Sequence, residues 1–382
     1  MSHRFRIINW NVAGAKYLER KSESSTKREA GEPTRERFRD DLNKELSYLL
    51  GRHQPHIVTL QEVVAYSPHG VSDASHAEQV IDIPPGYRPY SEWLIDTNRH
   101  SHQGKWTNVR ELGDWPPDAF FAQGNAILVH EKIPWFHIFL LPALRDQPEA
   151  SPGTSADRRE AVVRGLVEVV KLESGLYFGN RDTEPRAALV THLMLSELLD
   201  GPDVVQPLAK PLDIFVVNLH LTTLVMEREG VPAIDDEAAQ IRLRQLDILL
   251  NGIVSRYNRW RREGYPVRGK VYPKGEPHPR HPPIWIIAGD FNFTPESVEF
   301  VTMVRNGFID MMPSHKVGTK ASGLGKDPTL TVDYVFAGPR FEAIDPKVAE
   351  DGIQKNRVEV EDPTLVSDHF PLIVDVPIAL KP

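Results

Sequence analysis

The stretch that decides the fold is residues 284–292, which read IWIIAGDFN. An apolar run, Ile284–Ala288, is followed at once by Gly289, Asp290, Phe291 and Asn292. A short run of this kind, rich in β-branched residues and bounded by turn formers, predicts a buried strand. In α/β enzymes the catalytic groups commonly lie at such strand ends, because the rigid sheet fixes their positions and the loops give the substrate access to them. Taken alone, the motif could equally be a tight turn leaving a strand.

Further apolar runs of the same kind occur along the chain and also predict buried strands. They are Phe5–Ile8, Ile57–Leu60, Ala126–Val129, Leu166–Val170, Ile214–Leu219, Val332–Ala337 and Leu372–Val376.

Helical patterns lie between some of these runs. Thr34 can cap a helix from Arg35 to about Arg52, a second helix is expected from about Asp236 to Arg262, and a shorter one begins near Glu296. Such elements predict an α/β or α+β fold in which helices cover sheets. We expect one domain over residues 1–382, with long insertions near residues 14–33, 96–117 and 264–283.

Composition narrows the class of protein. Hydrophobic residues make up 40% and charged residues 26% of 382 residues, as in ordinary soluble proteins. No apolar run approaches the roughly 20 residues that span a bilayer, and the start shows no signal-peptide core, so we expect a cytoplasmic protein without a transmembrane segment. Cysteine is absent, which excludes disulfides, thiolate zinc sites and cysteine nucleophiles. The net charge of −8 disfavours coating of long nucleic acids, yet it permits phosphate chemistry because bound cations reverse the local potential.

Polar motifs follow several of the predicted strands. They are Asn9-Trp10-Asn11-Val12, Gln61-Glu62-Val63, Asn218-Leu219-His220-Leu221, Val332-Asp333-Tyr334 and Ser367-Asp368-His369-Phe370-Pro371. Carboxylates and amides without sulfur suit a hard cation such as Mg²⁺ or Mn²⁺. Two histidines beside them suit proton transfer or contact with a phosphoryl oxygen. Together these groups meet the needs of phosphate-ester cleavage.

Each motif alone has an alternative interpretation. Glu62 could be a solvated surface acid, Asn11 could form an Asx turn, and His220 could be a satisfied core histidine. The functional interpretation therefore depends on the joint occurrence of the motifs in this order.

In that order the motifs resemble the signatures of the endonuclease/exonuclease/phosphatase superfamily, which has the DNase I-like fold. The resemblance runs from residue 7 to about residue 375, and Gly124-Asn125-Ala126-Ile127-Leu128 fits it as well. It implies a four-layered α/β sandwich in which two mainly antiparallel sheets pack together with helices outside.

The resemblance also implies roles for individual residues. Metal binding would fall to Asn11, Glu62 and Asp368. Catalytic roles would fall to His220, Asp290, Asn292, Asp333 and His369. Asp290 would orient or deprotonate the attacking water, and Asp333 would orient His369 or share the metal region. Asn218 and Asn125 would contact substrate. Which residue is the general base stays open.

Departures from the family patterns limit the branch. Abasic-site endonucleases usually carry Asp two residues after the first Asn and Lys two residues after the Glu, where this chain has Ala13 and Val64. A histidine like His220 resembles the DNase I, sphingomyelinase, tyrosyl-DNA phosphodiesterase and deadenylase branches. In many of those enzymes a further acid pairs with that histidine, and Glu160 is the candidate here.

Three hypotheses for the substrate follow. A nuclease or nucleotide phosphodiesterase would use the cations and aromatics of Arg256–Arg280 on phosphates and bases, although this segment could be only a solvated helix end and surface loop. A phospholipid or small-phosphoester hydrolase would use an apolar rim, although its residues could simply pack a large loop. The residues of this rim would be Trp93, Trp106, Trp115, Phe120 and Phe121. A non-catalytic binding relative would have lost site residues, and every core motif is intact.

Overall fold

The structure is a computed structural model of the 382-residue chain. It describes residues 3–13, 34–67, 78–79, 81–82, 84–89, 99–100, 120–131, 133, 167–172, 186–200, 203–222, 232–255, 266–267, 270–271, 283–312, 318–321, 328–338, 359–360 and 366–378. The insertions expected near residues 14–33, 96–117 and 264–283 lie almost wholly outside these residues, and so does Glu160.

The strands follow one continuous hydrogen-bonded path, which divides into two halves. Each half is a mixed sheet, with both parallel and antiparallel neighbours. The first half contains β18 (Leu372–Ile378), β1 (His3–Asn11), β2 (Ile57–Ser67), β6 (Phe120–His130) and β4 (Tyr87–Pro89), with the short β17 (Glu359–Val360), β3 (Glu78–Gln79) and β5 (Arg99–His100) at its edges. Strand β1 runs parallel to β2 and antiparallel to β18.

The second half contains β13 (Ile309–Asp310), β16 (Asp333–Gly338), β12 (Ile284–Asp290), β9 (Asp203–His220), β8 (Arg186–Asp200) and β7 (Val167–Leu172). Strand β12 runs parallel to β9 and antiparallel to β16. Among the described residues, strand pairing joins the two halves only where Arg4 of β1 pairs with Asp200 of β8. Two small sheets, β10 (Pro266–Val267) with β11 (Lys270–Val271) and β14 (Lys320–Ala321) with β15 (Pro328–Leu330), lie apart from this path.

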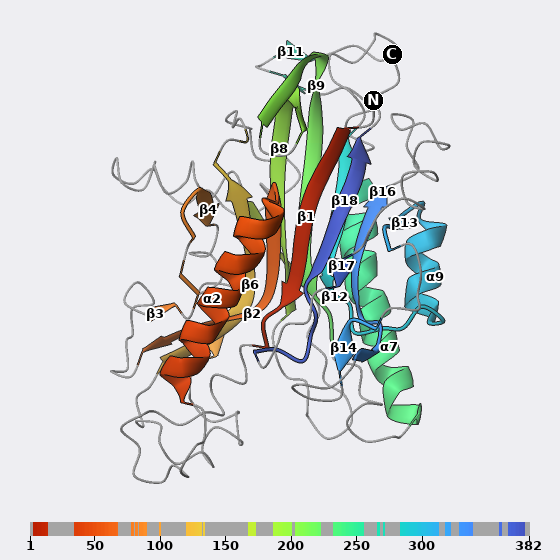
Figure 1. The fold of residues 1–382 in the computed structure, drawn as a ribbon. Helices are drawn as coiled ribbons and strands as arrows, with labels where there is room; N and C mark the ends of the chain where they lie inside the picture. The colour runs from red at the N-terminus through yellow and green to blue at the C-terminus, as the bar shows by residue number, and fades with distance from the viewer. Residues whose placement is uncertain are drawn as a thin grey trace, which may run out of the picture.

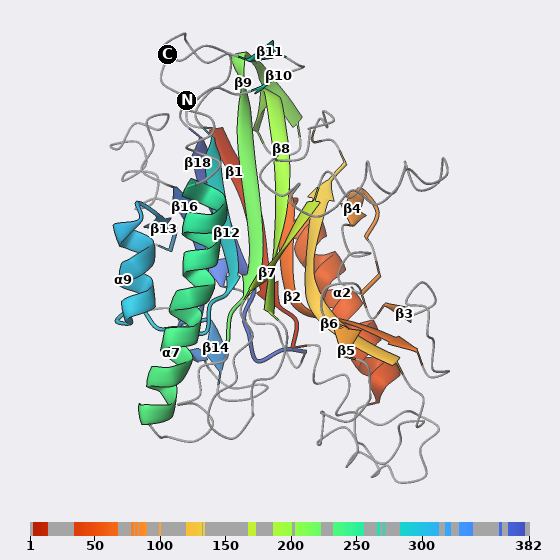
Figure 2. The same ribbon diagram turned by 180° about the vertical axis from the view of Figure 1, so that it is seen from behind.

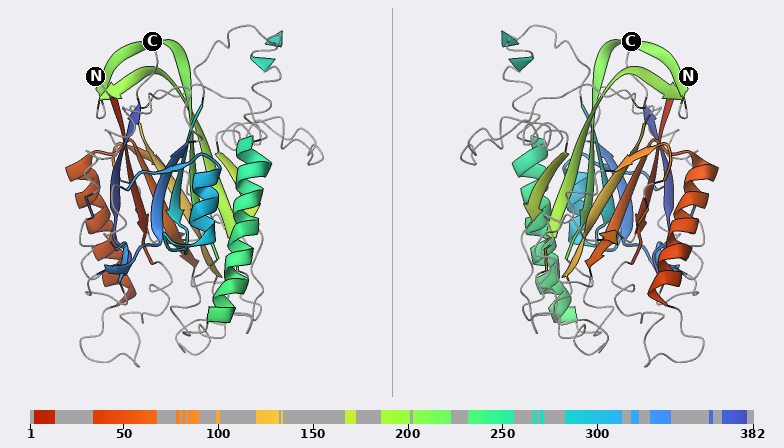
Figure 3. Two further views of the ribbon diagram at one scale, coloured as in Figure 1. Left: turned by 90° about the vertical axis from the view of Figure 1, so that its right-hand side faces the viewer. Right: turned by 90° about the vertical axis from the view of Figure 1, so that its left-hand side faces the viewer.

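Helices cover the outer faces of the two halves, which gives four layers (Figures 1 and 3). Helix α2 (Arg35–His53) covers the first half, while α7 (Pro232–Asp247), its π-helical continuation η3 (Ile248–Ser255) and α9 (Val298–Arg305) cover the second (Figure 2). The four-layered, mainly antiparallel α/β sandwich predicted from the sequence is therefore confirmed. Within the described residues, no helix has the length and apolarity needed to cross a membrane.

Strand β12 shows why its sequence lacks the alternation of a half-exposed strand. Ile284 and Ile286 belong to the hydrophobic cluster that fills the space between the two sheets and extends under α2. Trp285 and Ile287 point the other way and belong to the cluster under α7 and α9. All four side chains are completely buried. A strand covered on both faces must be apolar at every position, which is what Ile284–Ala288 shows.

The predicted elements agree with the observed ones except at the long strand β8, at several strands of only two or three residues, and at helix ends. Every predicted apolar run overlaps a strand, and α2 begins after Thr34, whose side chain accepts a hydrogen bond from the Arg37 amide as predicted. The short helix begins at Val298, two residues later than predicted, because Ser297 is its N-cap. Strand β8 was missed, since its Ala, Leu, Met and Glu residues favour a helix in isolation and only its long pairing with β9 makes it extended.

Candidate active site

Strand register brings three predicted residues to the same level at one end of the sandwich. Asp290 at the end of β12 pairs with His220 at the end of β9 and with Asp333 at the start of β16. Neighbouring strands lie about 4.8 Å apart. The pairing alone therefore places two carboxyl groups and an imidazole within a few ångströms of one another.

The Asp290 carboxylate is the centre of this group. Its Oδ2 atom accepts a hydrogen bond of 2.9 Å from the Asn11 side-chain amide. The same oxygen lies 3.6 Å from Nε2 of His220 and 3.8 Å from Nε2 of His369. Its other oxygen accepts a hydrogen bond of 3.0 Å from the Asn292 backbone amide, which fixes the carboxylate plane. One carboxylate oxygen thus faces groups from β1, from β9 and from the segment before β18.

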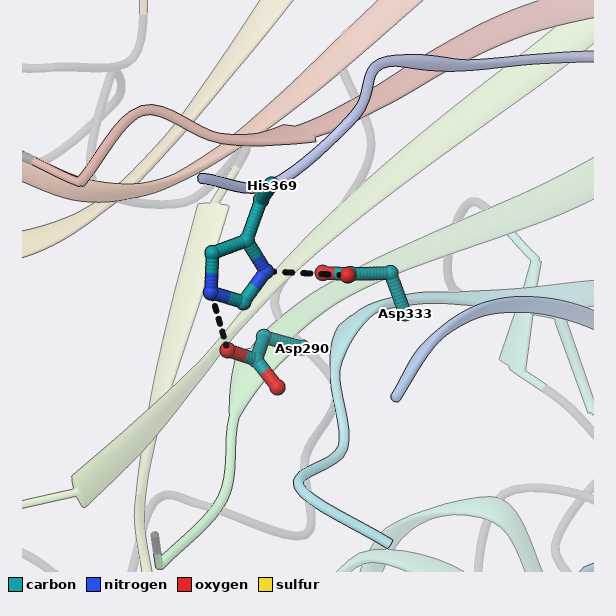
Figure 4. Close-up of side chains that lie close together, drawn as sticks. All are labelled: Asp290, Asp333 and His369. Carbon is teal, nitrogen blue, oxygen red and sulfur yellow. Dashed lines mark hydrogen bonds and ion pairs between the residues drawn. The ribbon is translucent and has the colours of Figure 1, made fainter. Parts of the chain in front are cut away.

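His369 and Asp333 form a buried pair beside it. The Nδ1 atom of His369 lies 2.9 Å from Oδ2 of Asp333, and the opposite ring nitrogen points toward Asp290 (Figure 4). Because a carboxylate can only accept, Nδ1 carries the proton, and this bond selects the tautomer and orientation of the ring. The other Asp333 oxygen, Oδ1, is buried and has no hydrogen-bond partner among the described residues.

Backbone contacts hold the His369 segment on β1. Trp10 donates its indole N–H to the His369 carbonyl at 3.0 Å, and the Ser367 hydroxyl donates to the Asn11 carbonyl at 2.8 Å. That hydroxyl also accepts a hydrogen bond from the His369 amide at 3.1 Å. The imidazole is therefore tied to the strand that supplies Asn11.

Two groups hold the start of β16. The Thr319 hydroxyl accepts hydrogen bonds of 3.0 Å from the amides of Val332 and Asp333. Burial, reinforced by nearby carboxylates, raises the pKa of the Tyr334 phenol, so this group stays protonated. Its hydroxyl lies 3.1 Å from the carbonyl of Phe293 and 2.9 Å from that of Thr331, which ties the loop after Asp290 to the entry of β16.

Glu62 reaches the site from an irregular part of β2. Leu60 pairs with Ala126 and Val63 with Gly124, so Gln61 and Glu62 face the single residue Asn125 in a β-bulge. Glu62 has a φ of 55°, a left-handed conformation that costs a non-glycine residue roughly 1–2 kcal/mol. The half-buried Glu62 side chain accepts a hydrogen bond of 3.3 Å from the Asn11 amide that also donates to Asp290. Strain of this kind clusters at functional sites, because the surrounding structure must hold it in place.

The remaining predicted residues take different positions. Asn292 is buried and donates its side-chain amide to the Leu221 carbonyl at 3.1 Å. Asn125 lies opposite the bulge and is 5% exposed, and Asp368 is half-buried beside His369. Glu160 lies outside the described residues.

Asn218 does not lie where a substrate could reach it. The residue is completely buried, and its amide donates to the carbonyls of Leu60 and Ala126 and accepts from Gln61. Asn218 and His220 share one face of β9, so the sequence pattern made both candidates. Asn218 lies one pleat deeper in the sandwich, which corrects its predicted contact with substrate to an internal one.

Sequence reasoning missed the roles of several residues. Asn9 and Gln61 stand in the quoted motifs but were given no role, although both are completely buried polar residues on the strands that carry Asn11 and Glu62. Their spacing of two before Asn11 and one before Glu62 was the available signal. Thr319 comes from a segment that carries no comparable signal in the sequence.

The donor set fits a divalent cation. Ligand atoms of Asp290, Asp333 and His369 all lie within 4.8 Å of one another. Glu62 lies on the other side of Asp290, where the Asn11 side-chain amide donates hydrogen bonds to both carboxylates. Most of the possible ligand atoms are oxygens of the three carboxylates Glu62, Asp290 and Asp333. Among the described residues, the buried Oδ1 atom of Asp333 has no hydrogen-bond partner. Such a set suits hard cations of the Mg²⁺ and Mn²⁺ class.

Two positions within this set could hold the cation. One lies among Asp290, Asp333 and His369, and the other lies beside Glu62 and Asn11. We favour the second, because a cation between Asp333 and His369 would break their hydrogen bond of 2.9 Å, whereas a cation beside Glu62 would replace the longer bond of 3.3 Å from the Asn11 amide. Asp290 belongs to both arrangements.

Comparisons with solved structures return distant likenesses. An endonuclease/exonuclease/phosphatase from Beutenbergia cavernae shares 15% identity over 99% of this chain and 72% of that chain, with a TM-score of 0.47. The human Nocturnin catalytic domain shares 13% identity over 98% of this chain and 93% of that chain, with a TM-score of 0.43. A family protein from Bacteroides thetaiotaomicron shares 13% identity over 100% and 97% of the two chains, with a TM-score of 0.42.

Sequence comparison is more decisive. No curated protein matches the chain. The profile of the Endonuclease/Exonuclease/phosphatase family matches residues 8–369, a span that holds every site residue named above. The chain belongs to the endonuclease/exonuclease/phosphatase family, whose members are nucleases, phosphatases and phosphodiesterases.

Proposed function

We propose that the protein is a divalent-metal-dependent hydrolase of phosphodiesters, acting on nucleic acid or nucleotides by in-line attack of water. The observation that carries this proposal is the arrangement around Oδ2 of Asp290, where the Asn11 amide, His220 and His369 meet one carboxylate oxygen. Hydrolysis of a phosphodiester needs an oriented water, donors to the phosphoryl oxygens and neutralisation of negative charge. This group offers all three once a cation is bound.

Glu62 and Asn11 are the proposed cation ligands, with Asp368 as a further carboxylate on that side. The bound cation supplies charge neutralisation at the phosphoryl oxygens. The need for a positive charge is supported by the residues present, because Glu62, Asp290 and Asp333 are acidic and no site residue named above is Lys or Arg. An anionic substrate would otherwise be repelled.

Asp290 is the proposed residue that orients the attacking water and accepts its proton. His220 donates from Nε2 to a phosphoryl oxygen. His369, with Nδ1 bonded to Asp333, presents Nε2 on the same side and contacts the scissile phosphate there. Asp333 acts through His369 by fixing its tautomer, which is a standard means of preparing an imidazole for proton transfer.

The choice of nucleic acid or nucleotide rests on the sequence of Arg256–Arg280, where cations alternate with tyrosines and a tryptophan. Only Pro266–Val267 and Lys270–Val271 of this segment are among the described residues. Hydrolysis of a lipid or another small phosphoester by the same groups is an outcome that the experiment below distinguishes.

The test is a panel of phosphoesters assayed with Mg²⁺, Mn²⁺ or EDTA. It contains plasmid DNA, single-stranded DNA, RNA, bis-p-nitrophenyl phosphate, p-nitrophenyl phosphate and sphingomyelin. We expect metal-dependent cleavage of a nucleic acid or of the diester. His369→Ala should lose it and His130→Ala should keep it, since half-buried His130 lies at the far end of β6, six residues beyond Gly124.

Three results would contradict the proposal in different ways. Turnover confined to sphingomyelin would move the substrate to lipids. Turnover confined to p-nitrophenyl phosphate would make the enzyme a monoesterase. No turnover of any ester by folded protein would favour a binding relative.

A further inference from the structure

A layer of buried polar side chains lies directly behind the site. It consists of Asn9 and Thr59 from the first half of the sheet path, Gln61 from the bulge of β2, and Asn218 from β9 in the second half. All four residues are completely buried. We call them the polar layer. Buried polar groups in an apolar core are costly unless they are bonded to one another, so such a layer needs a reason.

Gln61 is the centre of the polar layer. Its side-chain amide donates to Oδ1 of Asn9 at 2.9 Å and to Oδ1 of Asn218 at 2.6 Å, which uses both of its hydrogens. Thr59 donates to the same Asn9 oxygen at 2.8 Å. The Oδ1 atoms of Asn9 and Asn218 thus fix the Gln61 side chain from opposite sheets.

Asn218 also fixes the backbone at the bulge. Its amide donates to the carbonyl oxygens of Leu60 and Ala126, at 2.8 and 2.7 Å. Leu60 and Ala126 are the last regular pair before Gln61 and Glu62, which together face the single residue Asn125. A side chain from β9 therefore clamps both strands at the point where the bulge begins.

The contacts of the polar layer end next to three candidate site residues. Gln61 precedes Glu62, Asn218 lies two residues before His220, and the Asn9 amide donates at 3.3 Å to the carbonyl of Gly289, which precedes Asp290. Apolar packing alone would let the strand ends of one sheet slide over those of the other sheet. Directed hydrogen bonds fix them relative to one another.

We infer that Gln61 and Asn218 are positioning residues, which hold the bulge of β2 so that Glu62 stays in its left-handed conformation and presents its carboxylate to a divalent cation. The observation behind this is the pair of Asn218 hydrogen bonds to Leu60 and Ala126 together with the φ of 55° at Glu62. Without these hydrogen bonds, the backbone of Glu62 would relax toward an extended conformation, and its carboxylate would move away from Asn11. This inference rests on the proposed cation site of the hydrolase.

The test measures Mn²⁺ binding to the full-length protein by titration calorimetry, after removal of metal with EDTA. Asn218→Leu keeps the volume of the side chain and removes its donors. Gln61→Met keeps an unbranched side chain and removes only the amide, whose Oε1 has no partner among the described residues. We expect each variant to bind Mn²⁺ about 10- to 100-fold more weakly, as is usual when groups behind a metal ligand are lost. Glu62→Gln provides the reference for loss of the ligand itself.

A stability control separates positioning from general destabilisation. Leu195→Ala opens the core at a completely buried residue that pairs with Leu212, six residues along β9 from Asn218 and so about 20 Å away. It should lower the midpoint of thermal unfolding while Mn²⁺ affinity stays at the parental value.

Each outcome decides between alternatives. Parental Mn²⁺ affinity in both folded variants would overturn the positioning role and leave the proposed function standing. Failure of both variants to fold would assign the polar layer to stability alone and overturn the inference as well. If the parent binds no Mn²⁺, the cation site of the proposed function fails and the inference fails with it. Because binding is measured and not hydrolysis, the titration decides whether or not a substrate is known.

Discussion

Replacement of Gly289 by alanine tests how closely the site depends on the spacing of β9 and β12. Gly289 lies immediately before Asp290 and pairs with Leu219, the residue before His220. A Cβ atom added there would lie 2.0 Å from the Leu219 carbonyl oxygen and 2.9 Å from its carbonyl carbon. Ordinary contact begins at 3.4 Å, so the two strand ends must separate by about 1.4 Å.

That displacement sets the expected size of the effect. Asp290 and His220 would move apart, and a misplacement of about 1 Å in a catalytic arrangement costs on the order of 100-fold in rate. Overpacking of a buried backbone contact costs about 1–3 kcal/mol of stability. At about 2.1 cal/mol/K of unfolding entropy per residue, this corresponds to a fall in the unfolding midpoint of roughly 1–4 °C.

The assay compares kcat on bis-p-nitrophenyl phosphate with Mn²⁺ for the parent, Gly289→Ala and Gly51→Ala. Gly51 is a matched control, because it lies in α2 and an added Cβ there would meet nothing within 4 Å. Gly51→Ala should keep parental activity and gain roughly 0.5–1 kcal/mol, as a helical glycine does on replacement by alanine. Parental kcat and midpoint in Gly289→Ala would refute the geometry on which the site is built.

Further predictions concern single groups in and around the site. Asp333→Asn should lower kcat by about 100-fold or more without unfolding the protein, because it replaces the acceptor that fixes Nδ1 of His369; steady-state kinetics and circular dichroism check it. Glu299→Ala should cost about 3–5 kcal/mol, and so lower the thermal midpoint by roughly 4–6 °C, since it leaves Arg242 charged and buried where a 2.7 Å ion pair stood; an unchanged midpoint would contradict this. Burial raises the pKa of Asp310 to about 7, so the folded protein holds that proton more tightly than the unfolded chain does and loses stability as pH rises from about 4 to 7. Asp310→Asn should therefore gain stability over the parent at pH 8 and gain little at pH 4, and equal gains at both values would contradict the cause. Mn²⁺ at about 100 times its dissociation constant should stabilise the protein by about 2.7 kcal/mol, seen as a rise in the midpoint that EDTA abolishes; no shift would speak against the cation site.

Most of the long strands could be predicted, because a buried strand is composed almost entirely of apolar residues. Ile284–Ala288 is apolar throughout, and the structure covers it on both faces, so pattern and packing agree. Strand β8 could not be predicted in the same way, because Arg186–Asp200 is rich in helix formers and becomes a strand only by pairing with β9. Local preference was overridden there by a partner that lies later in the sequence.

The residues of the candidate site could be predicted from the motifs, whereas their arrangement in space could be predicted only in part. Asp290, His220 and Asp333 follow from motifs at strand ends, and the register brings them together. The depth of Asn218 could not be predicted, because a period of two places it on the same face as His220 and says nothing of how far each lies inside the sandwich. The position of its partner Gln61 depends on the β-bulge in β2, and no residue pattern in that strand predicts a bulge.

The proposed function depends most directly on a cation bound beside Glu62 and Asn11, and anomalous diffraction from a crystal soaked in Mn²⁺ would locate it. We predict one strong peak beside the Glu62 carboxylate, close to Asn11 and Asp290, that is lost in Glu62→Gln crystals. A peak only between His369 and Asp333 would move the cation and cancel the role given to Glu62. A map without any peak at this end of the sandwich would contradict the metal-dependent function itself.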